Sequence, residues 1–303
     1  MHRDRQRVRR HYVEPIPKPH KWTKRGLKLI TISAAVLVVA RIAISSPPLI
    51  HAAKSRSTVV ALASLAKKPA SINQTVLASQ VNQDINASNL EIGVSIIDLT
   101  NNQRYDYGLG DTQYLAASTT KILSASLFLH DVESGRDSLS QQLGSSTAQA
   151  EMKRMIVISD DTAWEDFNDL LGHPALLQYA QSLGMNSYDP DNNLINSDDL
   201  ATLLADLYQD KLLNSQHTNL LLSYMAQADY AQYIGGVIPK GVKFYHKIGF
   251  LQDRIMDAAI INNGRHPYVL IVFTKDPSGD YDDTAGLQVF HSITTDTLSA
   301  FGE

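Results

Sequence analysis

The spacing of apolar positions changes character twice between residue 71 and the C-terminus of the chain. Residues 71–85 carry apolar side chains near helical spacing, whereas residues 90–99 alternate between apolar and polar positions. A polar turn at 100–103 leads to a second extended segment over 104–109. The pattern therefore predicts a helix, a strand, a turn and a partner strand, in that order.

Helical spacing dominates the middle of the chain. Residues 122–129 are apolar nearly all round, which is typical of a buried helix. Further helical patterns cover 151–169 with a break at 159–161, 174–184, 199–213 and 218–227. Thr162 followed by Glu165 predicts a capping box for the helix after the break. Because no strand-like stretch interrupts residues 121–227, we expect a helical lobe.

Alternation returns near the C-terminus. Residues 242–250 alternate, and two further strands are expected over 255–261 and 268–273, joined by an Asn-Asn-Gly turn. Residues 285–301 have the spacing of a closing amphipathic helix. Strands at both ends of this body, with helices between them, indicate an α+β fold.

The same pattern divides the body into two lobes. We expect an α/β lobe built from 71–115 and 232–303, and a helical lobe over 116–231, together forming one domain over 71–303. A cleft is expected where the lobes meet, since ligand sites favour such seams.

The N-terminal end differs from the rest of the chain. Residues 1–28 hold ten Lys or Arg and only two acids, and an uncharged apolar run follows over 29–40. With its neighbours the run reaches about 18 residues, near the lower limit for crossing a bilayer. By the positive-inside rule we expect a basic cytoplasmic tail over 1–26, a transmembrane anchor over 27–45 and a linker over 46–70.

A cleaved signal peptide is the alternative for this end, with a small-residue cleavage site near His51-Ala52-Ala53. The basic segment is long for a signal peptide, which favours the uncleaved anchor. Both alternatives place the body outside the cytoplasm, membrane-anchored in the first and released in the second.

The composition is that of a globular protein, with 303 residues of which 44% are apolar and 19% charged. The chain has no cysteine, which excludes disulfides, thiol nucleophiles and thiolate metal sites. After residue 28 there are 29 acids against 17 Lys or Arg, so no nucleic-acid partner is expected. The ten histidines lack metal-ligand spacing and no dinucleotide fingerprint is present, so we expect no cofactor.

Candidate chemistry begins where the apolar segment 122–129 starts. Ser118 and Lys121 stand three residues apart, so on a helix the amine can reach the hydroxyl. A serine is a weak nucleophile until a base takes its proton, and a lysine can be that base when burial lowers its pKa. The spacing alone is weakly specific, because Ser64 and Lys67 repeat it in the expected linker.

Two further motifs follow in a fixed order. Ser-Asp-Asp at 159–161 falls between two expected helices, and Lys-Ile-Gly at 247–249 falls in an expected strand. In this order and context the chain resembles the class A β-lactamase family of penicillin-recognising serine hydrolases, over roughly 71–303. The resemblance implies an antiparallel sheet flanked by N- and C-terminal helices, with an inserted all-helical lobe.

The resemblance also implies catalytic roles. Ser118 is the residue that attacks the carbonyl and is acylated, and Lys121 takes or relays its proton. Ser159 passes a proton to the leaving nitrogen. The backbone N–H groups of Ser118 and Phe250 form the oxyanion hole.

Substrate binding is implied for four residues. Lys247 supplies positive charge to the substrate carboxylate, and Gly249 lets the substrate approach the strand closely. Phe250 contributes its backbone N–H, and Asp161 stands where the family has an asparagine that hydrogen-bonds the substrate. An ionised aspartate cannot donate that bond. Ile248 likewise replaces a Thr or Ser hydroxyl.

The segment 184–200 corresponds to the family loop that carries a glutamate for deacylation, and here it holds no Glu. Asp189 or Asp191 is a candidate substitute, with a shorter side chain. Arg254 is a weaker candidate for binding the substrate carboxylate. Acylation is therefore better supported than rapid turnover.

Three functions remain open. The first is a serine β-lactamase, and the second is a D-Ala-D-Ala peptidase or penicillin-binding protein of the same fold with slow deacylation. The third is a non-catalytic cell-wall-binding module that uses a degenerate cleft. The partners implied are a small-molecule β-lactam or a peptidoglycan peptide, and a membrane through the N-terminal helix.

Overall fold

The computed structural model describes residues 72–302 of the chain. The predicted tail, anchor and linker, and the second Ser-x-x-Lys spacing at Ser64, lie outside the described residues. Within 72–302, none of the helices combines the length and the apolar character that a membrane crossing requires.

A five-stranded antiparallel sheet forms the centre of the domain, with strand order β2-β1-β9-β8-β7. Its strands are β1 (Glu91–Asp98), β2 (Gln103–Gly108), β7 (Lys243–Leu251), β8 (Arg254–Asn262) and β9 (Tyr268–Lys275). All five were predicted from the sequence, and their existence is confirmed. The central strands β8 and β9 are buried almost throughout, because helices cover both faces of the sheet.

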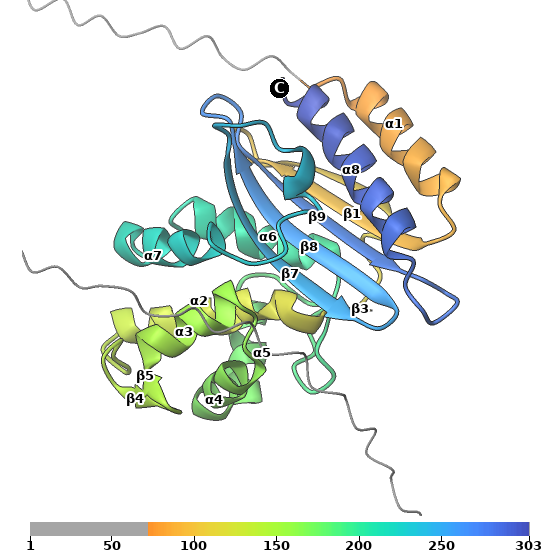
Figure 1. Cartoon of the computed structure of the whole chain (residues 1–303). Coiled ribbons are helices and arrows are strands. Elements are labelled where there is room, and N and C mark those ends of the chain that lie inside the picture. The colour runs from red at the N-terminus through yellow and green to blue at the C-terminus, as the bar shows by residue number, and fades with distance from the viewer. Residues whose placement is uncertain (1–71, 303) are drawn as a thin grey trace, which may run out of the picture. The chain divides into compact units, whose positions relative to one another are not determined.

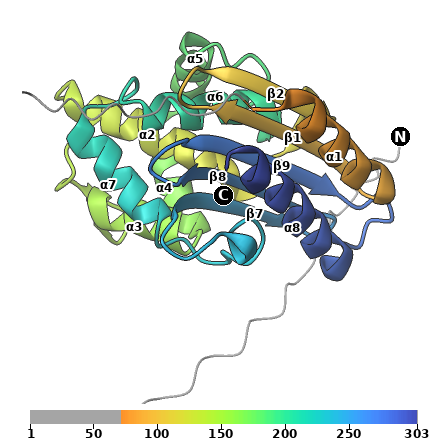
Figure 2. The same ribbon diagram turned by 90° about the horizontal axis from the view of Figure 1, so that it is seen from above.

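The helices α1 (Gln74–Ala87) and α8 (Asp283–Ala300) lie side by side on one face of the sheet (Figures 1 and 2). They bury apolar side chains such as Leu77 and Phe290 against it. The helix α6 (Ser197–Tyr208) covers the opposite face, in contact with β1, β8 and β9. This confirms the predicted antiparallel sheet between N- and C-terminal helices, although α6 comes from the segment assigned to the helical lobe.

The remaining helices cluster on the side of the sheet away from α1 and α8 (Figure 1). They are α2 (Lys121–Glu133), α3 (Ala148–Val157), α4 (Asp161–Leu171), α5 (His173–Ser182) and α7 (Ser215–Met225), with short 3₁₀ turns at η1 (Ala117–Thr120) and η2 (Gly235–Val237). The helix α2 is buried continuously from its first residue to Leu129, as its unbroken apolar sequence predicts.

Short strands correct the expectation that nothing interrupts 121–227. The two-residue strands β4 (Gln142–Leu143) and β5 (Ser146–Thr147) pair with each other. The two-residue strand β6 (Leu194–Ile195) pairs with β3 (Tyr114–Leu115). Two-residue strands are too short for alternation to be visible in a sequence. The β3–β6 pair attaches the loop before α6 to the segment just before Ser118.

The predicted capping box at Thr162 is wrong by two residues. The helix α4 begins at Asp161, and its N-cap is Asp160, whose carboxylate accepts the Ala163 N–H at 2.9 Å. Asp caps a helix at least as well as Thr, and an ion pair with Arg154 fixes this carboxylate in place.

Candidate active site

Ser118 lies in the 3₁₀ turn η1, half-buried, at the entrance to the buried helix α2. The preceding Ala117 has φ 47°, in the left-handed region that side chains other than glycine rarely adopt. Strand β7 passes close behind this turn. A Cβ placed on Gly249 would lie 2.9 Å from the Ala116 carbonyl oxygen and 3.1 Å from the Ser118 nitrogen, so a glycine is needed there.

Lys121 is completely buried one turn after Ser118. Its Nζ donates to the Ser159 carbonyl oxygen at 2.7 Å and to Asp161 Oδ1 at 2.6 Å. Burial lowers the pKa of Lys121 below its usual range, although the Asp161 carboxylate opposes the shift. The amine is therefore closer to deprotonation than a surface lysine, as a general base requires. Its described partners are Ser159 and Asp161 rather than the Ser118 hydroxyl.

Lys247 is the second buried amine of the site, on strand β7. Its Nζ donates to the Ser159 hydroxyl and to the Ile248 carbonyl oxygen, the latter at 2.9 Å. Burial, together with the nearby positive charge of Lys121, lowers the pKa of Lys247 to about 7. Ser159 thus meets both lysines, one through its carbonyl and one through its hydroxyl.

The loop that carries Ser159 is held in an unusual conformation. Ser159 has φ 56°, and the N–H groups on either side of it, at Ile158 and Asp160, both donate to the Arg154 carbonyl oxygen at 3.1 and 3.3 Å. Such a left-handed residue persists only where its surroundings fix it. Here it aims the carbonyl and the hydroxyl of one residue at two buried amines.

Asn193 is a site residue that the sequence analysis missed. Its backbone oxygen accepts the Ala116 N–H at 2.8 Å, and its Nδ2 donates to the Ala117 carbonyl oxygen at 2.9 Å. Its Oδ1 accepts the Thr120 hydroxyl at 2.7 Å. These three bonds fix the turn on both sides of Ser118. No spacing in the sequence signals them, because the partners are about 75 residues away.

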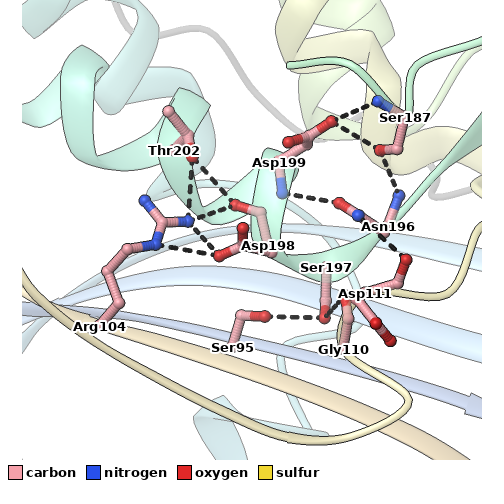
Figure 3. A network of polar contacts seen from close by, with 10 residues as sticks. All are labelled: Ser95, Arg104, Gly110, Asp111, Ser187, Asn196, Ser197, Asp198, Asp199 and Thr202. Carbon is pink, nitrogen blue, oxygen red and sulfur yellow. Dashed lines mark hydrogen bonds and ion pairs between the residues drawn. The ribbon is translucent and has the colours of Figure 1, made fainter. Parts of the chain in front are cut away.

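A polar network holds the loop that presents Asn193 (Figure 3). The Asp199 carboxylate accepts both the N–H and the hydroxyl of Ser187 at 2.6 Å, and the Ser187 hydroxyl accepts the Asn196 N–H at 3.0 Å. Deeper in, the buried Ser197 hydroxyl meets that of Ser95 on β1 at 2.9 Å. The loop is therefore closed on itself and attached to the sheet.

The two acids proposed as substitutes for the missing glutamate have other partners. Asp189 accepts the N–H groups of Asp191 and Asn192 at 2.9 and 3.2 Å and the Asn192 side-chain amide at 2.8 Å. Asp191 lies 2.7 Å from Nδ1 of His173. Neither acid lines the cavity beside Ser118.

That cavity has a volume of about 480 Å³ and opens between α4 and the end of β7. Its lining residues are Ala117, Ser118, Asp161, Trp164, Glu165, Asn168, Asp169, His173, Asn193, Phe250 and Leu251. Phe250 is 38% exposed and packs edge-on against the Tyr230 and Tyr233 rings. Arg254 lies outside the lining, at the start of β8, where its Nε donates to Asp253 at 2.7 Å.

The site thus brings together the three motifs that lie far apart in the sequence. Ser118, Lys121 and Ser159 gather at one end of the helical lobe, and Lys247 and Gly249 reach them from the edge strand β7. A nucleophile beside two buried amines and a shared hydroxyl is suited to acyl transfer with proton relay.

The comparisons with known proteins agree with this arrangement. The family model described as the β-lactamase enzyme family matches residues 76–301. The solved structure of PBP-A is 25% identical with a TM-score of 0.68, over 75% of this chain and 96% of PBP-A. A PBP-A mutant, described as an acyl-enzyme complex with penicillin G, is 25% identical with a TM-score of 0.69, over 75% and 96%.

A β-lactamase from Sphaerobacter thermophilus shares the fold at 23% identity, with a TM-score of 0.67 over 76% of this chain and 98% of that one. No curated protein sequence matches this chain significantly. Since the family model covers nearly all of the described domain and the three motifs meet at one site, the chain belongs to the β-lactamase family of serine hydrolases.

Proposed function

We propose that this protein is an acyl-transfer enzyme in which Ser118 attacks the carbonyl of a β-lactam or of a peptide ending in D-Ala-D-Ala, with slow loss of the acyl group. The observation that carries the proposal is the convergence of two buried amines, Lys121 and Lys247, on Ser159 beside the turn of Ser118. Buried amines are costly, and they are typical of sites that use them chemically.

The proton transfers follow from these contacts. Lys121 in its neutral form takes the Ser118 proton as the Oγ–carbon bond forms. The leaving nitrogen receives the Ser159 hydroxyl proton as the carbon–nitrogen bond breaks, and Lys247 replaces that proton. The lowered pKa of each lysine favours these transfers near neutral pH. Asp161 works against the first transfer, because its carboxylate favours the protonated form of Lys121.

Slow deacylation is supported by the loop over 184–200. This loop contains no glutamate. The Asp189 carboxylate accepts a backbone N–H of its own turn, and the Asp191 carboxylate is hydrogen-bonded to His173. No acid of this loop lines the cavity where a water would attack the acyl-enzyme. The solved acyl-enzyme complex of a PBP-A mutant with penicillin G also favours covalent capture as the step to test.

β-Lactam hydrolysis is a second candidate, because Glu165 lines the same cavity. A carboxylate there is able to activate a water if the acyl group comes within its reach. Rapid turnover therefore remains the alternative outcome of the experiment below.

The membrane anchor over 27–45 also stays a proposal. It rests on the apolar run behind a strongly basic segment, which by the positive-inside rule places the catalytic domain outside the cytoplasm. Fractionation of cells that produce the full chain, with and without residues 1–45, tests it. Recovery of the full chain in the soluble fraction at its full mass contradicts the anchor.

The decisive experiment incubates the full chain, purified in detergent, with a labelled penicillin beside the Ser118→Ala variant. A long-lived adduct on Ser118 supports the slow-deacylating enzyme. A burst followed by steady release of hydrolysed drug supports the β-lactamase. Labelling that is equal in both proteins, or absent from both, overturns the proposal and leaves the non-catalytic wall-binding module.

A further inference from the structure

One wall of the Ser118 cavity is formed by a single face of α4. Asp161, Glu165, Asn168 and Asp169 all line the cavity, and their spacing of four, three and one residues places them on that face. No lysine or arginine is among the described lining residues of this cavity. The nucleophile therefore faces a wall whose charged groups are acidic.

Two of these acids are uncompensated. The Asp161 carboxylate is paired with the Lys121 ammonium, so its charge is balanced. Glu165 and Asp169 are exposed, and within the described part of the chain neither has an ion-pair or hydrogen-bond partner. The lining His173 is already bonded to Asp191. The net charge facing a substrate is therefore negative.

This wall already holds one ammonium group. The Lys121 Nζ lies 2.6 Å from Asp161 Oδ1 and 5.4 Å from the centroid of the Trp164 ring, a carboxylate and an aromatic face that both attract a cation. The same helix repeats a carboxylate at Glu165 and at Asp169, the latter about 12 Å further along the axis at 1.5 Å per residue. Those two positions are open to the cavity.

We propose that the cavity selects acyl donors whose acyl part carries an ammonium group, which Glu165 and Asp169 attract while Ser118 attacks the carbonyl. This substrate class rests on the proposed function, since it presupposes acylation at Ser118. It includes amine-bearing peptides and aminopenicillins. A donor with a carboxylate at the same place is disfavoured, because like charges repel in a partly enclosed site.

Three penicillins that differ at one carbon of the acyl side chain test the proposal. Ampicillin carries an ammonium there, benzylpenicillin a hydrogen and carbenicillin a carboxylate. The second-order rate of acylation of the full chain should be about fivefold higher for ampicillin than for benzylpenicillin, and about fivefold lower for carbenicillin, at low salt. About 0.5 M NaCl should reduce the differences between the three rates, because salt screens exposed charges.

The double variant Glu165→Gln, Asp169→Asn should bring the three rates to within about twofold of one another. The matched control is Asp210→Asn, which removes an acid after the far end of α6 and keeps an acceptor for the Ser215 hydroxyl. The Asp210→Asn variant should show the same differences between the three acylation rates as the unaltered protein.

Equal rates in the unaltered protein, or an unchanged order in the double variant, overturn the substrate class while the proposed function stands. Failure of all three penicillins to label Ser118 overturns the proposed function, and this inference with it. Thermal unfolding of each variant shows that the comparison is made on folded protein.

Discussion

The two faces of the central sheet have different interiors. The face under α1 and α8 is packed mainly with apolar side chains such as Leu77 and Phe290. On the other side, where β7 meets the helical lobe, Lys121 and Lys247 are buried in contact with Ser159. Apolar burial stabilises a fold, whereas burial of an amine costs free energy. Apolar side chains pack on both faces, so both stabilise the fold, and on the second face this packing also offsets the cost of two buried amines.

The largest effect is expected on the apolar face. Phe290→Ala should lower the free energy of unfolding by about 3–5 kcal/mol, because Phe290 is fully buried and its removal leaves a cavity. Denaturant unfolding measures the loss, with Val76→Ala as the control, since Val76 is 50% exposed. Acylation per folded molecule should not change. A parallel loss of acylation would show that the two faces are not separable.

The next largest effect is expected from a substitution that displaces the site and leaves no cavity in the core. Gly249→Ala places a Cβ 2.9 Å from the Ala116 carbonyl oxygen, so β7 and the turn of Ser118 must move apart. We expect acylation to slow about 100-fold, the scale of a displacement of about 1 Å in a catalytic site. Penicillin labelling kinetics measure this effect. An unchanged rate would contradict the required close approach.

The buried amine on β7 predicts a pH dependence of stability. The pKa of Lys247 is about 7 in the folded protein and near 10.4 in the unfolded chain, so the unfolded chain binds the extra proton between these values. The free energy of unfolding should therefore rise by about 1.4 kcal/mol per pH unit between about pH 8 and 9.5, and this contribution should be flat below about pH 6.

Lys247→Met should remove that slope and leave the apolar face unchanged. Denaturant unfolding at several pH values measures it. If the free energy of unfolding rises with pH equally steeply in the variant, the pH dependence comes from other groups. Burial of the Lys247 amine would then not have the predicted effect on stability.

The smallest predicted effect concerns the loop that holds the nucleophile. Asn193→Asp replaces the Nδ2 donor with an acceptor that faces the Ala117 carbonyl oxygen. Acylation should slow about tenfold, which corresponds to about 1.4 kcal/mol, the scale of one lost hydrogen bond. The control is Asn186→Asp in the same loop, where Nδ2 donates to Gly184 instead. If both variants slow acylation equally, Asn193 has no special role.

Periodicity predicted the long elements because their pattern is local. The five strands of the sheet and the helices of the domain were all expected from apolar spacing, since each repeats its pattern over several residues. The cap at Asp160 and the pair β3–β6 were not predicted correctly, because a cap is a choice between neighbouring polar residues and a two-residue strand has no period.

The site was predicted in part, for a similar reason. The motifs around Ser118, Ser159 and Lys247 are short and contiguous, so the sequence marks them and the structure gathers them at one place. Asn193 depends on contacts with a turn about 75 residues away, which no local pattern reports. The catalytic and substrate-binding roles of the motif residues remain predictions.

Three residues at the site share one backbone property. Ala117, Ser159 and Asn193 have φ of 47°, 56° and 50°, and each lies in contact with the nucleophile turn or with the two amines. Each is under conformational strain of the order of 1 kcal/mol, which a glycine would relieve. At Ala117 a glycine would relieve this strain without loss of a side-chain hydrogen bond. At Ser159 and Asn193 it would also remove the side-chain bonds to Lys247, Ala117 and Thr120, so these two residues keep a strained backbone in exchange for contacts that position the site.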